Sequence, residues 1–329
     1  MASRRSSGTE TVGAPTPALF LPPTHTERWD LARQLGVTTA VTGIPRDVDD
    51  PWSPANLRRV ADRFARAGID VAVIEDRPPM DDIMTGGPAQ EEQLETVQRL
   101  LRSMGEADIP VWCPCWMARH DWARTSTSVP SRGGSLVTAF DRADVEDAPP
   151  LGDVSRDTLW ENLEYFVERV LPVAEAADVK LAMHPDDPPL PSLRGVGRIL
   201  SSREGFDRLL SLSDSEYNGI AFCQGNFAAM GLDVPETIRR FGDRIHFAHF
   251  RDVDGDAERF TETWHDDGPT DMLAAMDAYR DVGFDGPIRP DHVPTMAGED
   301  NANPGYETNG RLFAIGYMKG LLERSESGR

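Results

Sequence analysis

The sequence has few lysines, few cysteines and no long apolar run. Lys180 and Lys319 are its only lysines, so its other basic side chains are arginines. The three cysteines, Cys113, Cys115 and Cys223, are an odd number and too few for a disulfide framework, so we expect free thiols in a cytoplasmic protein. No segment approaches the ~20 apolar residues that cross a membrane, so we expect no membrane partner.

Acidic side chains are abundant instead. The chain has 55 Asp and Glu residues against 34 Lys and Arg, which gives a net charge of −21 at pH 7. This charge repels phosphate backbones and disfavours nucleic acid as a partner. An excess of carboxylates with few lysines resembles proteins of halophilic organisms, so we interpret acidic runs such as 47–50 and 252–258 as solvated surface.

Short β-prone runs alternate with longer helical segments, which is typical of a parallel sheet built from βα units. The runs are ALFL (18–21), TTAVTG (38–43), DVAVIED (70–76), PVWCPCW (110–116), KLAMHP (180–185), GIAFC (219–223), IHFAHFR (245–251) and GPIRPD (286–291). Eight such units predict a single α/β domain, a (β/α)8 TIM barrel, with its functional side chains at the carboxyl ends of the strands.

The intervening segments carry helix signals. Ser53 before Pro54 predicts an N-cap, and Asp271 predicts another. We expect helices at 53–67, 89–104, 157–177, 202–211, 235–241 and 272–282. We assign residues 17–324 to the barrel, 1–16 to a disordered tail, 325–329 to a frayed C-terminus and 118–157 to one long irregular connection.

Four possible metal ligands end four consecutive strands. They offer nitrogen, sulfur, nitrogen and oxygen donors at one rim, and they are His184, Cys223, His249 and Asp291. Because side chains alternate along a strand, His249 shares a face with Phe247, and His246 is expected to point towards the helices.

Single residues also have structural interpretations. Cys223 alone is typical of a small buried hydrophobe, and His184 alone of a turn residue that bonds backbone. The set of four favours a metal site. Cys113 and Cys115 lack the second cysteine pair of a structural zinc site, so we expect buried strand there.

Several motifs resemble the mannonate dehydratase family. They are MHPDDPP (183–189), FCQG (222–225), RIHFAHFRD (244–252), IRPDH (288–292), NPGY (303–306) and GRLFAIGYMKG (310–320), with weaker similarity through ETWHDDGPTDM (262–272) and WCPCWMARHDWART (112–125). The resemblance covers most of the chain after about residue 28, and HPDDPP together with RPDH is its specific part.

The resemblance implies a metal-dependent hydro-lyase that removes water from D-mannonate to give 2-dehydro-3-deoxy-D-gluconate, a step in hexuronate breakdown. It implies the same four ligands for a family metal that is Mn²⁺ or Fe²⁺, whereas donor softness alone favours Zn²⁺. His292 and Tyr306 match the proton-transfer residues. We take His292 as the base and Tyr306 as the acid, with the reverse assignment open.

A divalent cation bound to the substrate carboxylate and an adjacent hydroxyl would stabilise the developing enediolate. Arg251 either pairs with that carboxylate or forms a salt bridge within the rim. Asp186, Asp187 and His265 are further candidates for substrate binding, although one of the aspartates could only cap the turn.

The chain departs from the family in loops. ALFLPP (18–23) lacks an Arg/Trp-rich opening and FCQGNFAAM (222–230) replaces a more hydroxyl-rich loop, which leaves the exact sugar acid open. The alternatives are a related aldonate dehydratase, a sugar isomerase or epimerase, a non-catalytic metal-binding barrel and a repair nuclease. Carboxylates usually stand at the Cys223 position in the isomerases, and the acidic surface disfavours a nuclease. The expected partner is a small sugar acid, and a homo-oligomer is a further possibility.

Overall fold

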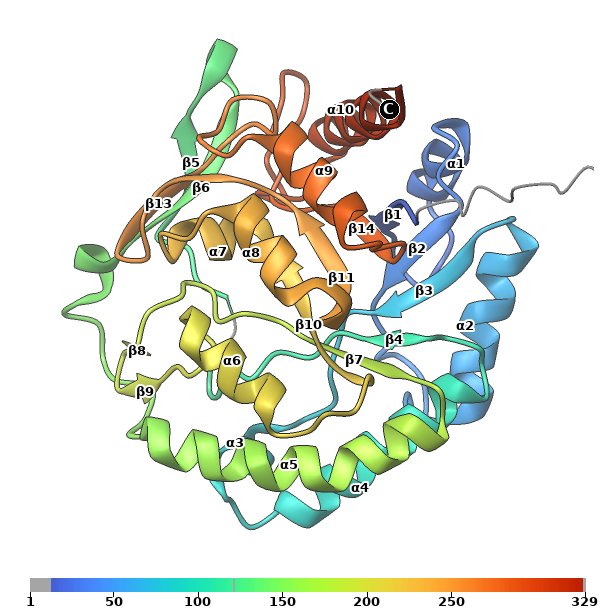
Figure 1. Cartoon of the computed structure of the whole chain (residues 1–329), viewed down its shortest axis with the longest axis vertical. Coiled ribbons are helices and arrows are strands. Elements are labelled where there is room, and N and C mark those ends of the chain that lie inside the picture. The colour runs from blue at the N-terminus through green and yellow to red at the C-terminus, as the bar shows by residue number, and fades with distance from the viewer. Residues whose placement is uncertain (1–12, 121, 328–329) are drawn as a thin grey trace, which may run out of the picture.

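The computed structural model describes residues 13–120 and 122–327, and side chains up to residue 324. Eight parallel strands close into a barrel in the order β1-β14-β11-β10-β7-β4-β3-β2 (Figure 1). They are β1 (Thr16–Phe20), β2 (Thr39–Thr42), β3 (Asp70–Ile74), β4 (Val111–Trp112), β7 (Lys180–Met183), β10 (Asn218–Cys223), β11 (Ile245–Phe250) and β14 (Pro287–Pro290). Each predicted run overlaps one of these strands, so the predicted TIM barrel is confirmed.

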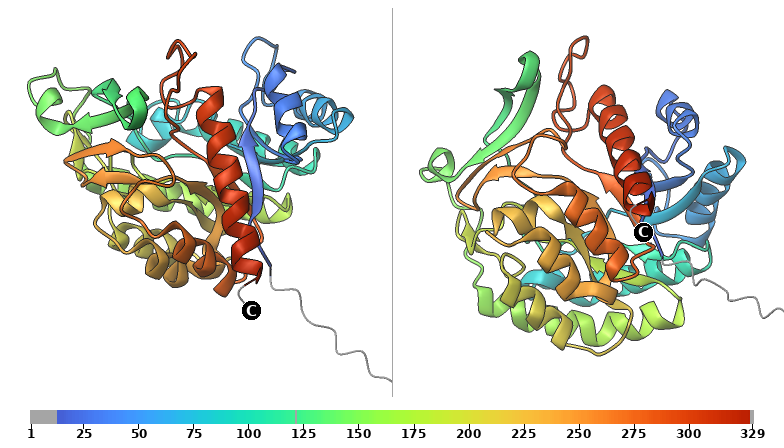
Figure 2. Two further views of the ribbon diagram at one scale, coloured as in Figure 1. Left: turned by 90° about the horizontal axis from the view of Figure 1, so that it is seen from above. Right: turned by 45° about the horizontal axis from the view of Figure 1, so that its top comes forward.

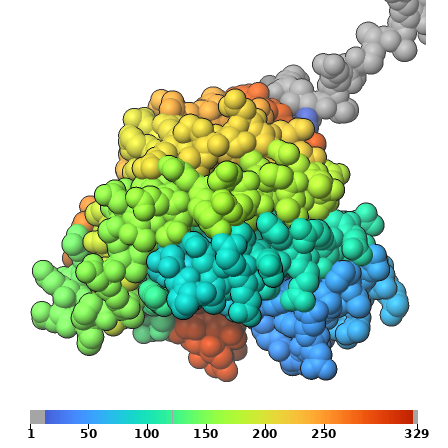
Figure 3. Space-filling model, turned by 90° about the horizontal axis from the view of Figure 1, so that it is seen from below, coloured from blue at the N-terminus to red at the C-terminus, as the bar shows by residue number. Residues whose placement is uncertain are grey.

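Helices surround the barrel. They are α1 (Glu27–Gln34), α2 (Pro54–Arg66), α3 (Asp81–Thr85), α4 (Gln90–Gly105), α5 (Arg156–Ala176), α6 (Arg203–Ser211), α7 (Gln224–Ala229), α8 (Val234–Phe241), α9 (Met272–Asp281) and α10 (Thr308–Ser327). Both predicted caps are confirmed, because Ser53 Oγ accepts from Asn56 N at 3.3 Å and Asp271 Oδ1 accepts from Ala274 N at 2.9 Å. Figure 3 shows the outer face on which α4 and α5 lie side by side.

A four-stranded antiparallel sheet stands beside the barrel mouth. Its order is β12-β13-β6-β5, from β12 (Val253–Gly255), β13 (Arg259–Glu262), β6 (Leu136–Asp141) and β5 (Ser126–Pro130). Figure 2 shows β5 and β6 projecting on the same side as the loop before α10, and a β-bridge joins Leu136 to Thr295 of that loop. The predicted irregular connection is therefore wrong, because 118–157 supplies two strands of this sheet.

Shorter elements complete the chain. They are the hairpin β8 (Ser192–Leu193) with β9 (Val196–Gly197) and the 3-10 turns η1 (Arg132–Gly134), η2 (Arg142–Val145) and η3 (Gly242–Arg244). The helix α10 continues to Ser327, past residue 324, where we placed the end of the folded domain. Residues 1–12 of the expected tail and the last two residues lie outside the described part of the chain. No helix of the described residues is long and apolar enough to span a membrane.

The barrel interior is filled by small side chains and one large ring. The cluster is Ala18, Val41, Val73, Val111, Cys113, Ala182, Ala221 and Phe247. Phe247 lies two residues before His249, whereas His246 lies outside this cluster and donates from Nδ1 to Leu181 O at 2.7 Å. The predicted alternation of β11 is therefore confirmed. The alanines on β7 and β10 leave the barrel mouth open above them.

Candidate metal centre and active site

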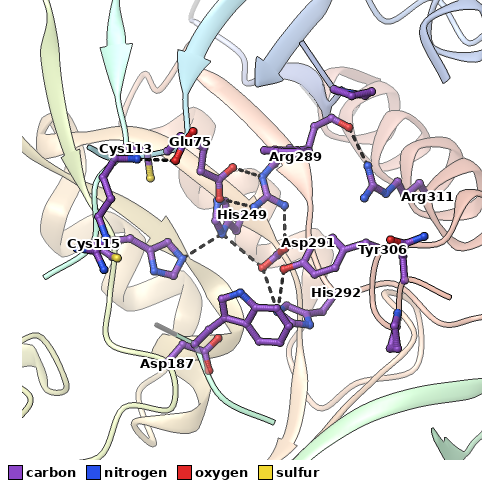
Figure 4. Close-up of a pocket in the computed structure, with 18 of the residues that line it drawn as sticks. Glu75, Cys113, Cys115, Asp187, His249, Arg289, Asp291, His292, Tyr306 and Arg311 are labelled. Carbon is purple, nitrogen blue, oxygen red and sulfur yellow. Dashed lines mark hydrogen bonds and ion pairs between the residues drawn. The ribbon is translucent and has the colours of Figure 1, made fainter. Parts of the chain in front are cut away.

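A cavity of about 670 Å³ opens at the carboxyl ends of the barrel strands (Figure 4). Its lining includes most of the side chains that the sequence singled out, namely His184, Asp187, His249, Asp291, His292 and Tyr306. A barrel mouth is where a TIM barrel carries its chemistry. The cavity is therefore the candidate active site.

Three of the four predicted donors cluster at this cavity, and the fourth, Asp291, lies beside one of them. One ligand atom each from His184, Cys223 and His249 lies within 4.8 Å of the other two. His184 Nε2 and His249 Nδ1 are 3.3 Å apart, and Asp291 Oδ2 is 3.5 Å from the same His249 nitrogen. Ligands bound at ~2.0–2.3 Å to one transition metal have separations of this size.

Both imidazoles have their second nitrogen held by an oxygen. His184 Nδ1 lies 2.7 Å from Pro185 O, which can only accept, so this nitrogen carries the hydrogen and Nε2 faces the cluster with a lone pair. His249 Nε2 lies 3.2 Å from the Glu75 carboxylate, which leaves Nδ1 for the cluster. A histidine held in this way is typical of a metal ligand.

An arginine holds the two carboxylates in place. Arg289 donates from Nε to Glu75 Oε2 at 2.7 Å and from Nη1 to Asp291 Oδ1 at 2.8 Å, so Oδ2 of Asp291 is free to face the cluster. Although burial favours the protonated acid, Arg289 and His249 lower the pKa of Glu75 to about 2. The pKa of Asp291 is likewise well below its usual value. Both carboxylates are therefore ionised at neutral pH.

Cys223 is set up as a thiolate. It is fully buried at the end of β10, and Arg251 Nη1 lies 3.3 Å from Sγ. Although burial opposes ionisation, the charge of Arg251 and the neighbouring His184 and His249 side chains lower the pKa of Cys223 to about 6. Burial and Glu75 raise the pKa of Cys113 well above its usual value, so that thiol stays neutral. At neutral pH Cys223 is therefore a thiolate, which is the form that binds a metal, whereas Cys113 is a neutral thiol.

The donor set fits a divalent transition metal. It combines two imidazole nitrogens, a thiolate and a carboxylate oxygen, whereas Mg²⁺ and Ca²⁺ prefer oxygen ligands alone. Each donor residue has one polar contact outside the cluster and one donor atom directed into it. This arrangement positions the donors independently of the cation.

Arg251 is bound by protein side chains, so it is not free to pair with a substrate carboxylate, which was one of the two roles that we considered. Its Nε and Nη2 donate to Glu262 at 2.8 and 2.7 Å, and Nη1 donates to Asp187 and Asn226 at 3.0 and 2.9 Å. It is 1% exposed and does not line the cavity. The salt bridge within the rim, the alternative we left open, is the arrangement found.

The other three residues predicted to bind substrate differ in whether they line the cavity. Asp186 is buried away from the cavity, where it accepts from Leu200 N at 2.7 Å. His265 is buried with Nε2 2.9 Å from Phe250 O, and burial lowers its pKa to about 4. The substrate-binding expectation is therefore wrong for both. Asp187 does line the cavity, although its oxygens already accept from Arg124 at 2.8 and 3.0 Å.

Acidic residues that we expected to be solvated behave in two ways. Asp50 lies on the surface and pairs with Arg99 at 3.0 Å. Asp252 is 2% exposed and accepts from the backbone and hydroxyl of Thr270, both at 2.7 Å. The surface interpretation is therefore wrong for Asp252, which follows β11 directly and closes a loop at the rim.

His292 and Tyr306 face each other across the cavity wall. Tyr306 Oη lies 3.2 Å from His292 Nε2, and Arg124 Nη2 lies 3.2 Å from the same nitrogen. Because a guanidinium can only donate, Nε2 is an acceptor and the ring hydrogen is on Nδ1, towards Thr138 and Glu262. Burial lowers the pKa of His292 to about 4 and raises that of Tyr306 well above 10. A neutral base thus contacts a protonated phenol.

Backbone geometry brings this pair together. His292 has φ of 41°, a left-handed conformation that is uncommon for residues other than glycine and frequent at functional sites. Gly305 has φ of 82°, and a β-carbon there would stand 3.0 Å from His292 Nδ1. Only glycine therefore lets the NPGY turn approach closely enough to place Tyr306 beside the imidazole.

Sequence reasoning missed several residues of the cavity, among them Glu75, Arg289, Trp122, Cys115, Arg28 and Arg311, and it missed Arg124, which contacts His292 of the cavity wall. Glu75 follows β3 and lies two residues beyond Val73 of the barrel interior, so alternation could have identified it. Cys115 lines the cavity and is half-buried, whereas we expected buried strand. The residues around Arg124 do not indicate a functional role. Arg124 lies just before β5 and reaches the site through the four-stranded sheet β12-β13-β6-β5, here called the side sheet.

Comparisons with known proteins agree with one another. Residues 28–152 and 150–328 match the family model described as D-mannonate dehydratase (UxuA). Mannonate dehydratase of Streptococcus pneumoniae (strain 70585) is 33% identical over 319 residues, 88% of this chain and 86% of that protein. The enzyme of that name from Thermotoga maritima is 35% identical over 327 residues, 88% of this chain and 90% of the other.

Solved structures give the same picture. The crystal structure of mannonate dehydratase from Streptococcus suis serotype 2 superposes with a TM-score of 0.88 at 32% identity, covering 96% of this chain and 94% of that one. A structure of L-ribulose 3-epimerase has a TM-score of 0.61 at 15% identity, covering 96% and 93%. At that identity the epimerase shows only a common fold.

The cluster predicts a pH-dependent metal affinity. Despite burial and the nearby Arg289, Glu75 and Asp291 raise the pKa of His249 well above its usual value, so a proton on His249 competes with the cation at pH 7. A proton on Cys223 competes below about pH 6. We expect the Kd for Mn²⁺ to fall about tenfold per pH unit for each proton displaced as pH rises from 5 to 8. Calorimetry in buffers of different ionisation enthalpy would count the protons, and an affinity independent of pH would contradict this protonation scheme.

Proposed function

The chain belongs to the D-mannonate dehydratase family and is a hydro-lyase that acts on D-mannonate, and we propose that His184, Cys223, His249 and Asp291 hold its divalent cation. The observation that carries this proposal is the convergence of donor atoms from His184, Cys223 and His249, with Asp291 beside His249, and each of these residues is fixed by a contact outside the cluster. Mn²⁺ or Fe²⁺ is our assignment from the family, with Zn²⁺ less favoured.

The reaction removes the proton at C2 and the hydroxyl at C3 of D-mannonate. Both steps are difficult, since a carbon next to a carboxylate is a weak acid and hydroxide is a poor leaving group. A bound divalent cation supplies a Lewis acid for the negative charge that develops on the substrate oxygens. The protein must supply a base for the proton and an acid for the hydroxyl.

We assign these roles to His292 and Tyr306. Nε2 of His292 is the acceptor nitrogen at the cavity and is neutral at pH 7, so it takes the C2 proton. The Tyr306 hydroxyl keeps its own proton because its pKa is raised, and it gives this proton to the departing C3 hydroxyl, which leaves as water. The resulting enol loses the proton of its C2 hydroxyl and gains one at C3, which gives the 2-keto-3-deoxy acid without a net change in protons.

The contact between these residues closes the proton balance. After the elimination His292 has gained one proton and Tyr306 has lost one. The 3.2 Å separation between Nε2 and Oη allows direct transfer back, which restores both groups without a water molecule. Glu262 lies 3.7 Å from Nδ1 and stabilises the imidazolium while it exists.

The thiolate ligand also supports our proposal of a cytoplasmic location. All three cysteines are free, and Cys223 binds a cation only in its reduced form. A reducing compartment preserves that form.

A product assay tests the function. We expect protein reconstituted with Mn²⁺ or Fe²⁺ under anaerobic conditions to convert D-mannonate to a 2-keto-3-deoxy acid, and to act less well on the C2 and C3 epimers. The assay should be run in low salt and at ~1 M salt, where surface repulsion is screened over ~3 Å. Formation of an isomeric sugar acid without loss of water would identify an epimerase instead.

Cys223→Ser tests the ligand set. The serine hydroxyl is not ionised at neutral pH, so we expect metal content and activity to be lost together. Cys113→Ser is the matched control, because that thiol lines the same cavity but is neutral, and it should retain the metal. Metal analysis by plasma mass spectrometry distinguishes the two, and full metal occupancy in Cys223→Ser would exclude it as a ligand.

His292→Asn and Tyr306→Phe test the proton transfers. Neither residue is in the donor cluster, so we expect both variants to keep their metal while kcat for D-mannonate drops about 10²–10⁴-fold. Because the two residues exchange one proton, the double variant should be little worse than the worse single one. Additive losses would show that the two residues act separately.

A further inference from the structure

Two arginines that line the cavity, Arg28 and Arg311, have no carboxylate partner among the described residues. By contrast, Arg289 of the same cavity contacts Glu75 and Asp291, and Arg124 and Arg251, which do not line it, both contact Asp187 and Glu262. Among the described residues, no salt bridge involves Arg28 of α1 or Arg311 of α10, although both line the cavity. Arg311 is 8% exposed and Arg28 is half-buried. A buried cation without an anion is costly and calls for a ligand.

Arg311 is held in place rather than disordered. Its Nη1 donates to Phe20 O at 2.8 Å, and its Cζ lies 5.6 Å from the centre of the Tyr306 ring. The preceding Gly310 packs against the Pro294 carbonyl and Val293 with no room for a β-carbon, which fixes this end of α10. Within the described part of the chain this is the one hydrogen bond found for the guanidinium, so its remaining N–H groups are available to a molecule in the cavity.

The electrostatic environment favours an anion. Burial, together with the nearby Arg28 and Arg289, lowers the pKa of Arg311 to about 10, so it stays charged at pH 7 but is repelled by its neighbours. An acid bound between Arg28 and Arg311 would relieve this repulsion. Arg289 cannot serve as that acid's main partner, because Glu75 and Asp291 occupy its donors.

The pair also lies apart from the donor cluster. In Figure 4, Arg311 is on the opposite side of the pocket from Cys113 and Cys115, with Arg289 and Asp291 between them. It belongs to the β1 side of the barrel, since α10 contacts β1 and β14. Both arginines line the same cavity as His184, His249 and Asp291.

We propose that Arg28 and Arg311 form an anion subsite that binds a carboxylate of the sugar acid. A planar guanidinium matches a carboxylate with two parallel hydrogen bonds, and Arg28 completes the pocket from α1. The proposal rests on the proposed function for the identity of the substrate. The carboxylate comes either from C1 of D-mannonate or from C6 of an aldarate such as D-mannarate.

Arg311→Gln and Arg28→Gln test the subsite in the metal-loaded full chain. We expect KM for a substrate that uses the subsite to rise at least about tenfold in Arg311→Gln, with kcat changed less than about threefold, and a smaller rise in Arg28→Gln. Arg311→Lys should recover part of the loss because it keeps the charge. The matched controls are Arg324→Gln on α10 and Arg33→Gln on α1, whose side chains lie outside the cavity. Unchanged KM in both Arg311→Gln and Arg28→Gln would overturn the proposal.

The two carboxylates are separated by comparing D-mannonate with D-mannarate. Loss with both substrates identifies the C1 carboxylate, and loss with D-mannarate alone identifies the C6 carboxylate. Metal content and thermal unfolding show whether Arg311→Gln is folded. If it is not, Arg28→Gln decides, because that side chain is half-exposed and has no structural hydrogen bond in the described chain.

Direct binding keeps this test separate from the proposed function. If the wild-type protein turns over no sugar acid, calorimetric titration with D-mannonate and D-mannarate still measures the subsite. A loss of affinity for either acid in Arg28→Gln or Arg311→Gln would support it. Equal affinity in the wild type and both variants would refute it.

Discussion

The compensation of buried charge is the constraint on which this site depends. Glu75, Arg289 and Asp291 alternate in sign along one wall of the barrel mouth, and Arg251 links the Cys223 thiolate to Glu262 on another. Each charge is removed from water, so each requires an opposite charge within contact distance. Removing one partner from such a pair costs about 3–5 kcal/mol, because the other is left buried and uncompensated. The side chains around the cation are therefore fixed by the fold itself.

This compensation also separates structural charges from functional ones. Arg251 and Asp186 are saturated by protein partners and stabilise the rim, although their motifs are typical of substrate contacts. Arg311 is also buried, but among the described residues its guanidinium contacts only the Phe20 carbonyl and the Tyr306 ring. The sequence around Arg251 and the sequence around Arg311 do not show which arginine has carboxylate partners. The distinction lies in which acceptors the fold brings within reach.

Local periodicity predicted much of the fold and of the candidate site. The alternation in IHFAHFR placed His249 inwards and His246 outwards, because two faces of a barrel strand have different neighbours. Parallel strands all end at one rim, which is why four strand-end residues could be grouped without knowing any distance. The helix caps at Ser53 and Asp271 were equally readable, since capping depends only on neighbours three residues away. Pairing between distant segments carries no such signal, so the side sheet and the partners of Arg251 and His265 were missed.

The side sheet joins the first and second halves of the chain. β6 follows β4, the fourth barrel strand in the sequence, and β13 follows β11, the seventh. The hydrogen-bonded ladder between β6 and β13 therefore connects the two halves of the barrel. Arg124, just before β5, contacts Glu262 at the end of β13 through this junction. A gene cut between β6 and β7 would yield two fragments, each with one side of that ladder exposed. Reassembly of such fragments would have to restore the ladder before the acid–base pair could work.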